Sequence, residues 1–206
     1  VAEDALILGI SGRYEFKNKG IDVFIDAMGQ LNRNNGLGKE VLAFILVRAG
    51  HAGANKELLH NLELPYQAVT STDLYLTHYL NDSANDPVMN RIRAQKLRNS
   101  EEDKVKIFFV PSYLNGDDGV FNMPYYDLLV GMDLTAFPSY YEPWGYTPLE
   151  SLAFKVPTIT TTLAGFGLWV KEHYNMNHPG IEVIHREDGD ASNVATAIAE
   201  WVKNYT

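Results

Sequence analysis

Short, continuously apolar runs alternate along the chain with stretches in which apolar residues recur at helical spacing. The predicted strands are Ala5–Ile10, Val41–Val47, Lys106–Val110, Leu134–Phe137, Val156–Thr160 and Ile181–Ile184. The predicted helices are Ile21–Leu31, Pro124–Met132, Pro148–Phe154, Leu168–Tyr174 and Ala191–Tyr205. Because the strands are apolar on both faces and alternate with helices, the pattern predicts an α/β fold with a doubly wound, mainly parallel sheet.

One region interrupts this alternation. Ala54 to Lys104 separates two predicted strands by many more residues than a simple crossover needs. Leu74–Leu80 and Val88–Leu97 have helical patterns, so we expect a helical insertion over about residues 55–104. The second of these helices carries a basic cluster of Arg91, Arg93, Lys96 and Arg98. This cluster is either a solvated helix face or a contact between copies of the chain.

Composition narrows the classes of protein. The 206 residues are enough for one domain, and 46% hydrophobic with 21% charged residues is a globular composition. The absence of cysteine excludes disulfides and thiolate metal sites. A net charge of −9 argues against a general nucleic-acid partner, and no apolar run is long enough to predict a membrane span. The chain begins with Val1 rather than Met, which suggests a processed or truncated chain.

A candidate anion site follows the strand Leu134–Phe137, in the segment Tyr140–Glu150. Thr147 is a suitable N-cap, and Glu150 lies three residues later, as in a capping box. The free N–H groups of such a helix start attract phosphate, and Gly145 lets the backbone approach a ligand closely. The alternative is a plain strand–helix turn.

Glu142 lies in the same loop, beside the expected anion site, where a carboxylate can hydrogen-bond sugar hydroxyls. The surrounding aromatic residues are Tyr140, Tyr141, Trp144 and Tyr146. Aromatic walls with a few polar groups suit a carbohydrate or a nucleobase. The alternative for some of these rings is ordinary packing beneath the loop.

A cluster of cations follows the first predicted strand, in the loop between Gly12 and Gly20. Arg13, Lys17 and Lys19 gather there in an otherwise acidic chain. Concentrated positive charge at a strand end is what a diphosphate leaving group needs. The alternative is an exposed charged loop. The sequence contains neither a dinucleotide-binding fingerprint nor a P-loop.

Tyrosines follow the strand Lys106–Val110. Tyr113 lies in the next loop, and Tyr125 and Tyr126 begin the next helix. A tyrosine face can hold a nucleobase by stacking, and the alternative is ordinary packing. The segment Asp117–Gly119 resembles a turn more than a metal site, and the histidines show no ligand spacing, so we expect no metal.

Three segments, in order, closely resemble glycogen synthases of the animal and fungal type. They are Arg13–Gly20, Ser139–Glu150 and Val156–Gly167. The resemblance covers most of the chain and is weakest in Ala54–Lys104. Related glycosyltransferases share two glutamates at the spacing of Glu142 and Glu150, but the run YEPWGYTP favours glycogen synthase.

The resemblance implies a retaining glycosyltransferase of the GT-B type, with two Rossmann-like domains facing across a cleft. Such an enzyme transfers glucose from UDP-glucose to the non-reducing end of an α-1,4-glucan, without a metal or another cofactor. Residues 1–206 would be the C-terminal, donor-binding domain, inactive alone, and the acceptor-side domain would be absent. The implied location is cytoplasmic. The implied partners are the nucleotide sugar, the glucan through the absent domain, and further copies through the insertion.

The resemblance also implies roles for residues. The catalytic residues would be Arg13, Lys19, Glu142 and Glu150. The substrate-binding residues would be Tyr113, Tyr125, Trp144, Gly145, Tyr146 and Thr147. In the family motifs Arg13 and Lys19 face the donor diphosphate, whose negative charge grows as the bond to glucose breaks. Glu142 matches an acid near the transferred glucose and Glu150 one near the ribose, whereas Tyr125 matches a tyrosine stacked on uracil and Tyr113 one whose backbone meets the base.

Two other functions remain open from the sequence. One is a nucleotide-sugar-binding module without catalysis, and the other is a sucrose- or trehalose-synthase-like glycosyltransferase. The arginine-rich regulatory helix of animal and fungal relatives is not evident, because the cluster from Arg91 to Arg98 lies in the insertion. The sequence therefore gives no support for control by glucose 6-phosphate.

Overall fold

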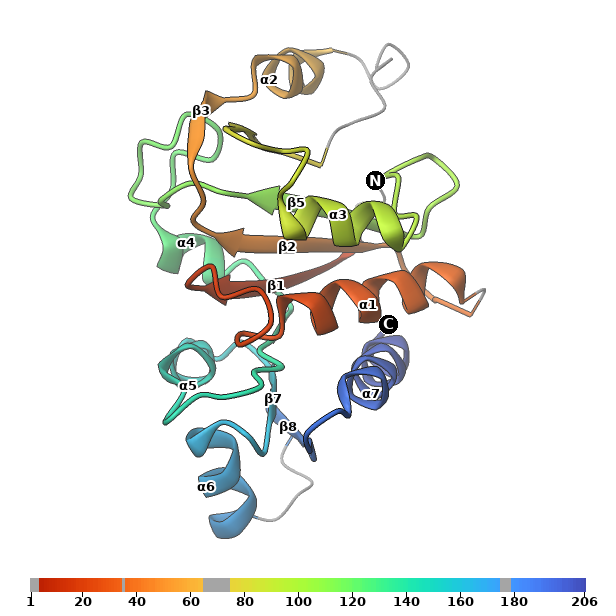
Figure 1. Ribbon diagram of the computed structural model, residues 1–206, viewed down its shortest axis with the longest axis vertical. Coiled ribbons are helices and arrows are strands. Elements are labelled where there is room, and N and C mark those ends of the chain that lie inside the picture. The colour runs from red at the N-terminus through yellow and green to blue at the C-terminus, as the bar shows by residue number, and fades with distance from the viewer. Residues whose placement is uncertain (1–3, 35, 65–74, 175–178) are drawn as a thin grey trace.

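A six-stranded parallel sheet organises the protein (Figure 1). The computed structural model describes residues 4–34, 36–64, 75–174 and 179–206. The strands are β1 (Leu6–Gly12), β2 (Val41–Val47), β5 (Val105–Val110), β6 (Leu134–Ala136), β7 (Thr158–Thr161) and β8 (Ile181–Ile184). Their order is β5-β2-β1-β6-β7-β8, with every neighbouring pair parallel. The predicted α/β fold with a parallel sheet is confirmed.

Helices cover both faces of this sheet. On one face lie α1 (Ile21–Arg33), α3 (Pro87–Ala94) and α7 (Ala191–Tyr205), to the right in Figure 1. On the other lie α4 (Tyr125–Leu129), α5 (Tyr146–Ala153) and α6 (Gly165–His173). A two-stranded antiparallel ribbon, β3 (His51–Ala54) with β4 (His78–Leu80), lies beyond β5, next to α2 (Lys56–Glu63).

The core lies between the sheet and the face formed by α1 and α7. Its fully buried side chains include Leu8, Ile10, Phe24, Ile45 and Ile198. α1 packs along α7, so residues from the two ends of the chain share one core. No helix among the described residues is both long enough and apolar enough to cross a membrane.

The predicted helix at Leu74–Leu80 is wrong. His78–Leu80 is strand β4, and its partner is β3, a short strand that the sequence pattern did not predict. Leu76 forms a bridge with Phe109 of β5, so this segment continues the pairing at the sheet edge. A short apolar run fits a strand as well as a helix, and long-range pairing decides between them. Leu74 lies outside the described residues.

The helix predicted at Val88–Leu97 is present as α3. Its basic cluster is partly used inside the domain, because Nε of Arg91 donates to Oδ1 of Asp26 on α1 at 2.6 Å. Arg93 donates to the carbonyl oxygen of Ser83 at 3.1 Å. These two side chains therefore attach α3 to neighbouring segments. Association of copies through the insertion stays a prediction.

Candidate functional site

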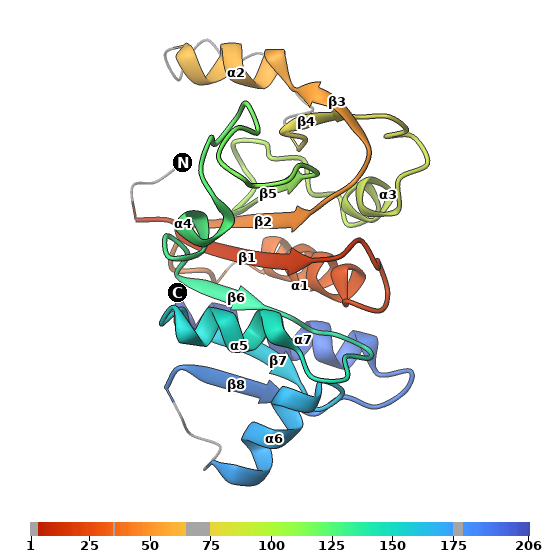
Figure 2. The same ribbon diagram turned by 90° about the vertical axis from the view of Figure 1, so that its left-hand side faces the viewer.

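All six sheet strands point the same way, so their carboxyl ends meet at one edge, on the right in Figure 2. Ligands of parallel α/β folds bind at this edge. The loops that carry the predicted site residues leave from it. They are residues 13–20 after β1, 111–124 after β5, and 137–145 after β6. The order of the sheet reverses between β1 and β6, and so the first and third of these loops flank the reversal.

Lys19 and Glu142 form an ion pair at this reversal. Their side chains are only 13% and 17% exposed. The amide of Tyr140 donates to the carbonyl oxygen of Asn18 at 2.8 Å, and this bond joins the two loops next to the pair. Because water screens a largely buried pair only in part, the attraction between Lys19 and Glu142 is stronger than that between surface charges. The structure thus brings two of the predicted catalytic residues into contact.

Arg13 lies apart from this pair. Its side chain is 78% exposed and makes an ion pair with Glu15 of the same loop at 3.1 Å. Exposed pairs of this kind contribute little to stability, so the guanidinium is free to reorient toward a ligand. Its neighbour Tyr14 is fixed instead, because the Tyr14 hydroxyl donates to Asp86 at the start of α3 at 2.5 Å. The predicted contact of Arg13 with a diphosphate stays a prediction.

The loop that carries Glu142 is held by the loop after β7. The amide of Gly165 donates to the carbonyl oxygen of Glu142 at 3.0 Å, and the amide of Phe166 donates to that of Trp144 at 2.6 Å. A side chain at Gly165 has no room, since an added Cβ would lie 2.2 Å from the carbonyl oxygen of Pro143. The segments Ser139–Glu150 and Val156–Gly167, which the sequence analysis singled out separately, are therefore in direct backbone contact.

The helix after this loop begins earlier than the capping box predicted. Gly145, not Thr147, occupies the N-cap position, and no side chain caps the helix. Gly145 has φ 103°, which favours glycine and turns the chain directly into α5. Thr147 is therefore the second helical residue, so the Thr147–Glu150 capping box is absent. The amides of Tyr146 and Thr147 lie in the first turn, where a helix has no internal partner for them, so they can bind an anion.

Tyr125 lies deeper than Tyr113. The hydroxyl of Tyr125 is 2.7 Å from Oγ of Ser11 in β1. Burial raises the pKa of Tyr125, and the nearby Glu150 carboxylate raises it further. Tyr125 and Glu150, predicted to contact the base and the ribose, are thus close enough to interact. Tyr113, by contrast, is 64% exposed.

Arg48 was missed by the sequence analysis. It directly follows β2, and its guanidinium carbon lies 4.4 Å from the centre of the Tyr113 ring. The signal was available, because Arg48 is a cation at the carboxyl end of a predicted strand. Arg48 adds positive charge to the same edge, beside the ring that the sequence placed near a nucleobase.

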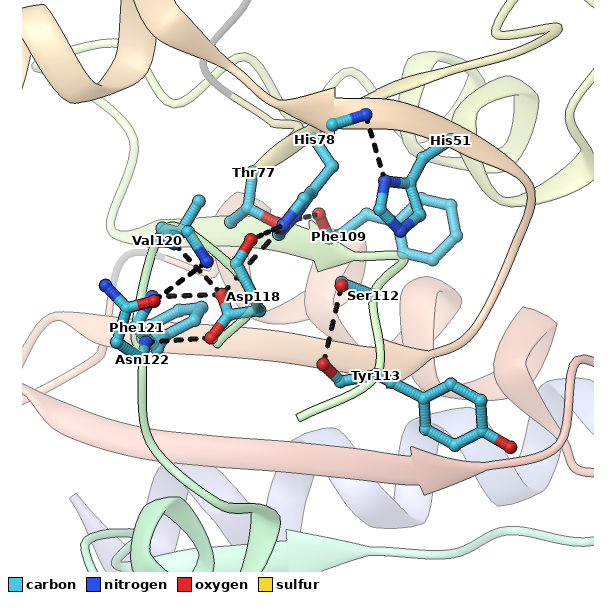
Figure 3. Close-up of polar contacts among 12 residues, drawn as sticks. His51, Thr77, His78, Phe109, Ser112, Tyr113, Asp118, Val120, Phe121 and Asn122 are labelled. Atoms are coloured by element: carbon cyan, nitrogen blue, oxygen red, sulfur yellow. Dashed lines mark hydrogen bonds and ion pairs between the residues drawn. The ribbon is translucent and has the colours of Figure 1, made fainter. Parts of the chain in front are cut away.

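The far end of the Tyr113 loop is anchored to β4 (Figure 3). Nε2 of His78 is 2.8 Å from the backbone oxygen of Asp118, and Nδ1 is 2.8 Å from Oγ1 of Thr77. The Asp118 carboxylate accepts amide hydrogen bonds from Val120, Phe121 and Asn122, as a turn residue does. The prediction of a turn here is confirmed.

Trp144 is partly packed. Its ring lies edge-on to Phe166 at 5.8 Å and 6.3 Å from Trp169 of α6, with about a third of its surface exposed. Tyr146 and Tyr141 are more exposed than Trp144. In the described ranges, no three histidine, aspartate or glutamate side chains gather as metal ligands would.

Known proteins with similar sequences show which family the chain belongs to. The glycogen synthase family model matches residues 2–73 and 68–206. The chain belongs to the glycogen synthase family. Glycogen [starch] synthase isoform 2 of Saccharomyces cerevisiae is 31% identical over 268 residues, which cover 98% of this chain and 38% of the yeast protein. The liver glycogen [starch] synthase of Mus musculus is 31% identical, over 83% of this chain and 31% of the mouse protein.

This member of the glycogen synthase family thus spans less than two fifths of the length of these relatives. The alignment with the yeast enzyme is longer than the whole chain, so the yeast enzyme carries residues that this chain lacks. The two family matches overlap at residues 68–73, within the predicted insertion.

A solved structure was also found. It is that of WaaG, a glycosyltransferase involved in lipopolysaccharide biosynthesis. It matches 99% of this chain and 43% of its own, at 17% identity and a TM-score of 0.45.

Proposed function

We propose that this chain is the donor-binding domain of a glycogen synthase. It binds UDP-glucose, and the complete enzyme transfers glucose to the non-reducing end of an α-1,4-glucan with retention. The observation that carries the proposal is the contact between Lys19 and Glu142 next to the start of α5. A cation, a carboxylate and free helix amides are the groups that a sugar diphosphate needs.

The chemistry follows from these charges. Breaking the bond between glucose and the diphosphate leaves an extra negative charge on UDP. Lys19 and the amides of Tyr146 and Thr147 lie where they can stabilise that charge, and they act more strongly in the transition state than in the bound donor. Glu142 keeps Lys19 in place before the donor arrives and faces the glucose afterwards.

Calorimetry on the 206-residue chain tests the donor. We expect UDP to bind more tightly than ADP, because Tyr125 and the Tyr113 loop present a surface suited to uracil. Lys19→Ala removes one charge-assisted contact, which is worth about 1.5–3 kcal/mol, and should weaken UDP binding at least tenfold. Lys39→Ala is the matched control, since Lys39 precedes β2 at the opposite edge of the sheet and pairs with Asp4.

Three results would each contradict a different part of this proposal. Equal or tighter binding of ADP would remove the uracil assignment and favour another nucleotide-sugar glycosyltransferase. Unchanged UDP affinity in Lys19→Ala would remove the diphosphate assignment. Elongation of glycogen by this polypeptide alone would show that it is not a donor-binding half. A non-catalytic binding module would instead bind UDP normally and stay inactive when joined to an acceptor-side domain.

The remaining parts of the proposal come from the family resemblance. We propose that the reaction needs no metal or other cofactor, and that the glucan is bound by a second domain. A cytoplasmic location fits the use of a nucleotide sugar. Association through the insertion is part of the same proposal, although Arg91 already pairs within the domain.

A further inference from the structure

Arg186 is a buried arginine in the loop after β8, with only 5% of its surface exposed. One guanidinium nitrogen, Nη1, donates to the carbonyl oxygen of Pro138. Its Nε is buried without a hydrogen-bond partner. Across the described ranges, no carboxylate lies within ion-pair distance of this guanidinium.

A buried cation without an ion pair is costly. Arginine stays protonated inside proteins, so it keeps its charge here even though burial lowers the pKa of Arg186. The nearby carboxylates of Asp22 and Asp190 raise that pKa in part, without forming an ion pair with the guanidinium. An apolar side chain of similar volume would avoid the desolvation cost. Arg186 lies at the carboxyl edge of the sheet and contacts the loop that carries Glu142. The desolvation cost of its buried charge therefore falls at the candidate site.

Arg186 fixes the first residues of the Glu142 loop. The Pro138 carbonyl group that it binds also lies against Gly20, where an added Cβ would be 1.9 Å from the oxygen. The guanidinium carbon lies 5.4 Å from the centre of the Tyr140 ring. Arg186 therefore holds Pro138 against the end of the Lys19 loop and Tyr140 beside it.

The loop after β8 makes a second contact with Tyr140. The Tyr140 hydroxyl donates to the carboxylate of Asp188 in this loop at 2.6 Å. The amide of Tyr140 in turn donates to the carbonyl oxygen of Asn18, the residue before Lys19. A chain of contacts thus runs from Arg186 through Tyr140 to the backbone that carries Lys19, and Glu142 follows Tyr140 by two residues.

We propose that Arg186 is a positioning residue for the donor diphosphate: it aligns Lys19 with Glu142 by fixing Pro138 and Tyr140. This inference rests on the proposed function. It assigns no contact between Arg186 and the donor. Removing the guanidinium should let the two loops separate, and a displacement of about 1 Å in a catalytic site can lower the reaction rate on the order of a hundredfold.

The test compares Arg186→Gln, Arg186→Lys and the control Arg93→Gln in the 206-residue chain. Calorimetry measures the affinity for UDP and, by competition, for uridine, which lacks the phosphates. Hydrogen exchange measures protection of the Tyr140 amide. We expect Arg186→Gln to weaken UDP binding by about tenfold to a hundredfold, because the charge-assisted contact of Lys19 with the diphosphate is misplaced. Uridine binding should change less than about threefold, and the Tyr140 amide should lose protection. Arg186→Lys keeps the charge and one donor, so its losses should be smaller, and Arg93→Gln should match the wild type.

The outcomes separate this inference from the proposed function. If the wild-type chain does not bind UDP, the proposed function fails, whereas the exchange data still report on the contact chain. Equal losses for UDP and uridine would show a structural role only and overturn the inference. It is also overturned if Tyr140 keeps its protection, or if UDP affinity is unchanged. If Arg186→Gln does not fold, Arg186→Lys carries the same comparison.

Discussion

Replacing Gly165 by alanine should disturb the site through the backbone alone. Gly165 is the first residue of α6, and its φ is not in the left-handed region, so alanine fits the local conformation. An added Cβ, however, would lie 2.2 Å from the carbonyl oxygen of Pro143 and 3.3 Å from Cα of Trp144. Both are backbone atoms, which cannot move aside as a side-chain end can. The loop of Glu142 must therefore shift away from α6.

The size of the effect follows from two contributions. Overpacking of this kind costs about 1–3 kcal/mol. The shift also weakens the bonds from Gly165 to Glu142 and from Phe166 to Trp144, at about 1 kcal/mol each. We expect a loss of about 2–4 kcal/mol in the free energy of unfolding. Because Glu142 moves relative to Lys19, UDP affinity should fall by about tenfold or more, as loss of one charge-assisted contact does.

Urea unfolding and calorimetry of the 206-residue chain measure the two effects. Gly131→Ala is the matched control, because an added Cβ there would meet only ordinary contacts, the nearest at 3.4 Å. The reasoning is refuted if Gly165→Ala unfolds at the same urea concentration as Gly131→Ala. A normal stability with weakened UDP binding would contradict the argument as well, since the predicted clash cannot be relieved without cost.

Other residues offer independent tests. Tyr14→Phe removes the hydrogen bond to Asp86 and should lower stability by about 1–2 kcal/mol in urea unfolding; an unchanged midpoint would show that the bond contributes nothing. Burial lowers the pKa of His51, so protonation of the unfolded chain should destabilise the protein as the pH falls through 6.5. His51→Gln should therefore reduce the loss of stability between pH 7.5 and about 5.5, and an identical loss would contradict the assignment. Tyr125→Ala should weaken UDP binding by about tenfold to a hundredfold, as loss of a stacked base does, and an unchanged UDP affinity in this variant would rule out stacking.

The sequence predicted the sheet well because its strands are marked locally. Val41–Val47 is apolar throughout, and the structure places β2 over the same residues. Leu74–Leu80 carries no such mark, since its strand β4 is defined by pairing with His51–Ala54. The predicted start of α5 was wrong for a related reason. The Thr–Pro–Leu–Glu sequence suits a cap at Thr147, but the backbone freedom of Gly145 lets the helix begin before it.

The sequence predicted which residues of the candidate site carry charge, but not which of them are in contact. Lys19 and Glu142 were each recognisable as charged residues after strands, yet nothing local in the sequence pairs residues 123 positions apart. The sequence analysis did not single out Arg186, which follows the last predicted strand. Its burial depends on Pro138, Tyr140 and Gly20, which are distant in the chain.

The strand order has a consequence for how the chain folds. β5, β2 and β1 carry the Lys19 loop, whereas β6, β7 and β8 carry the Glu142 loop, and only the pairing of β1 with β6 joins these halves within the sheet. Long-range pairing of this kind forms slowly, because loop closure precedes the contacts that compensate for it. We therefore expect the ion pair between Lys19 and Glu142 to form late in folding. A ligand that contacts both halves would stabilise the pairing of β1 with β6 by mass action. A higher ligand concentration would then lower the fraction of molecules in which this pairing is open.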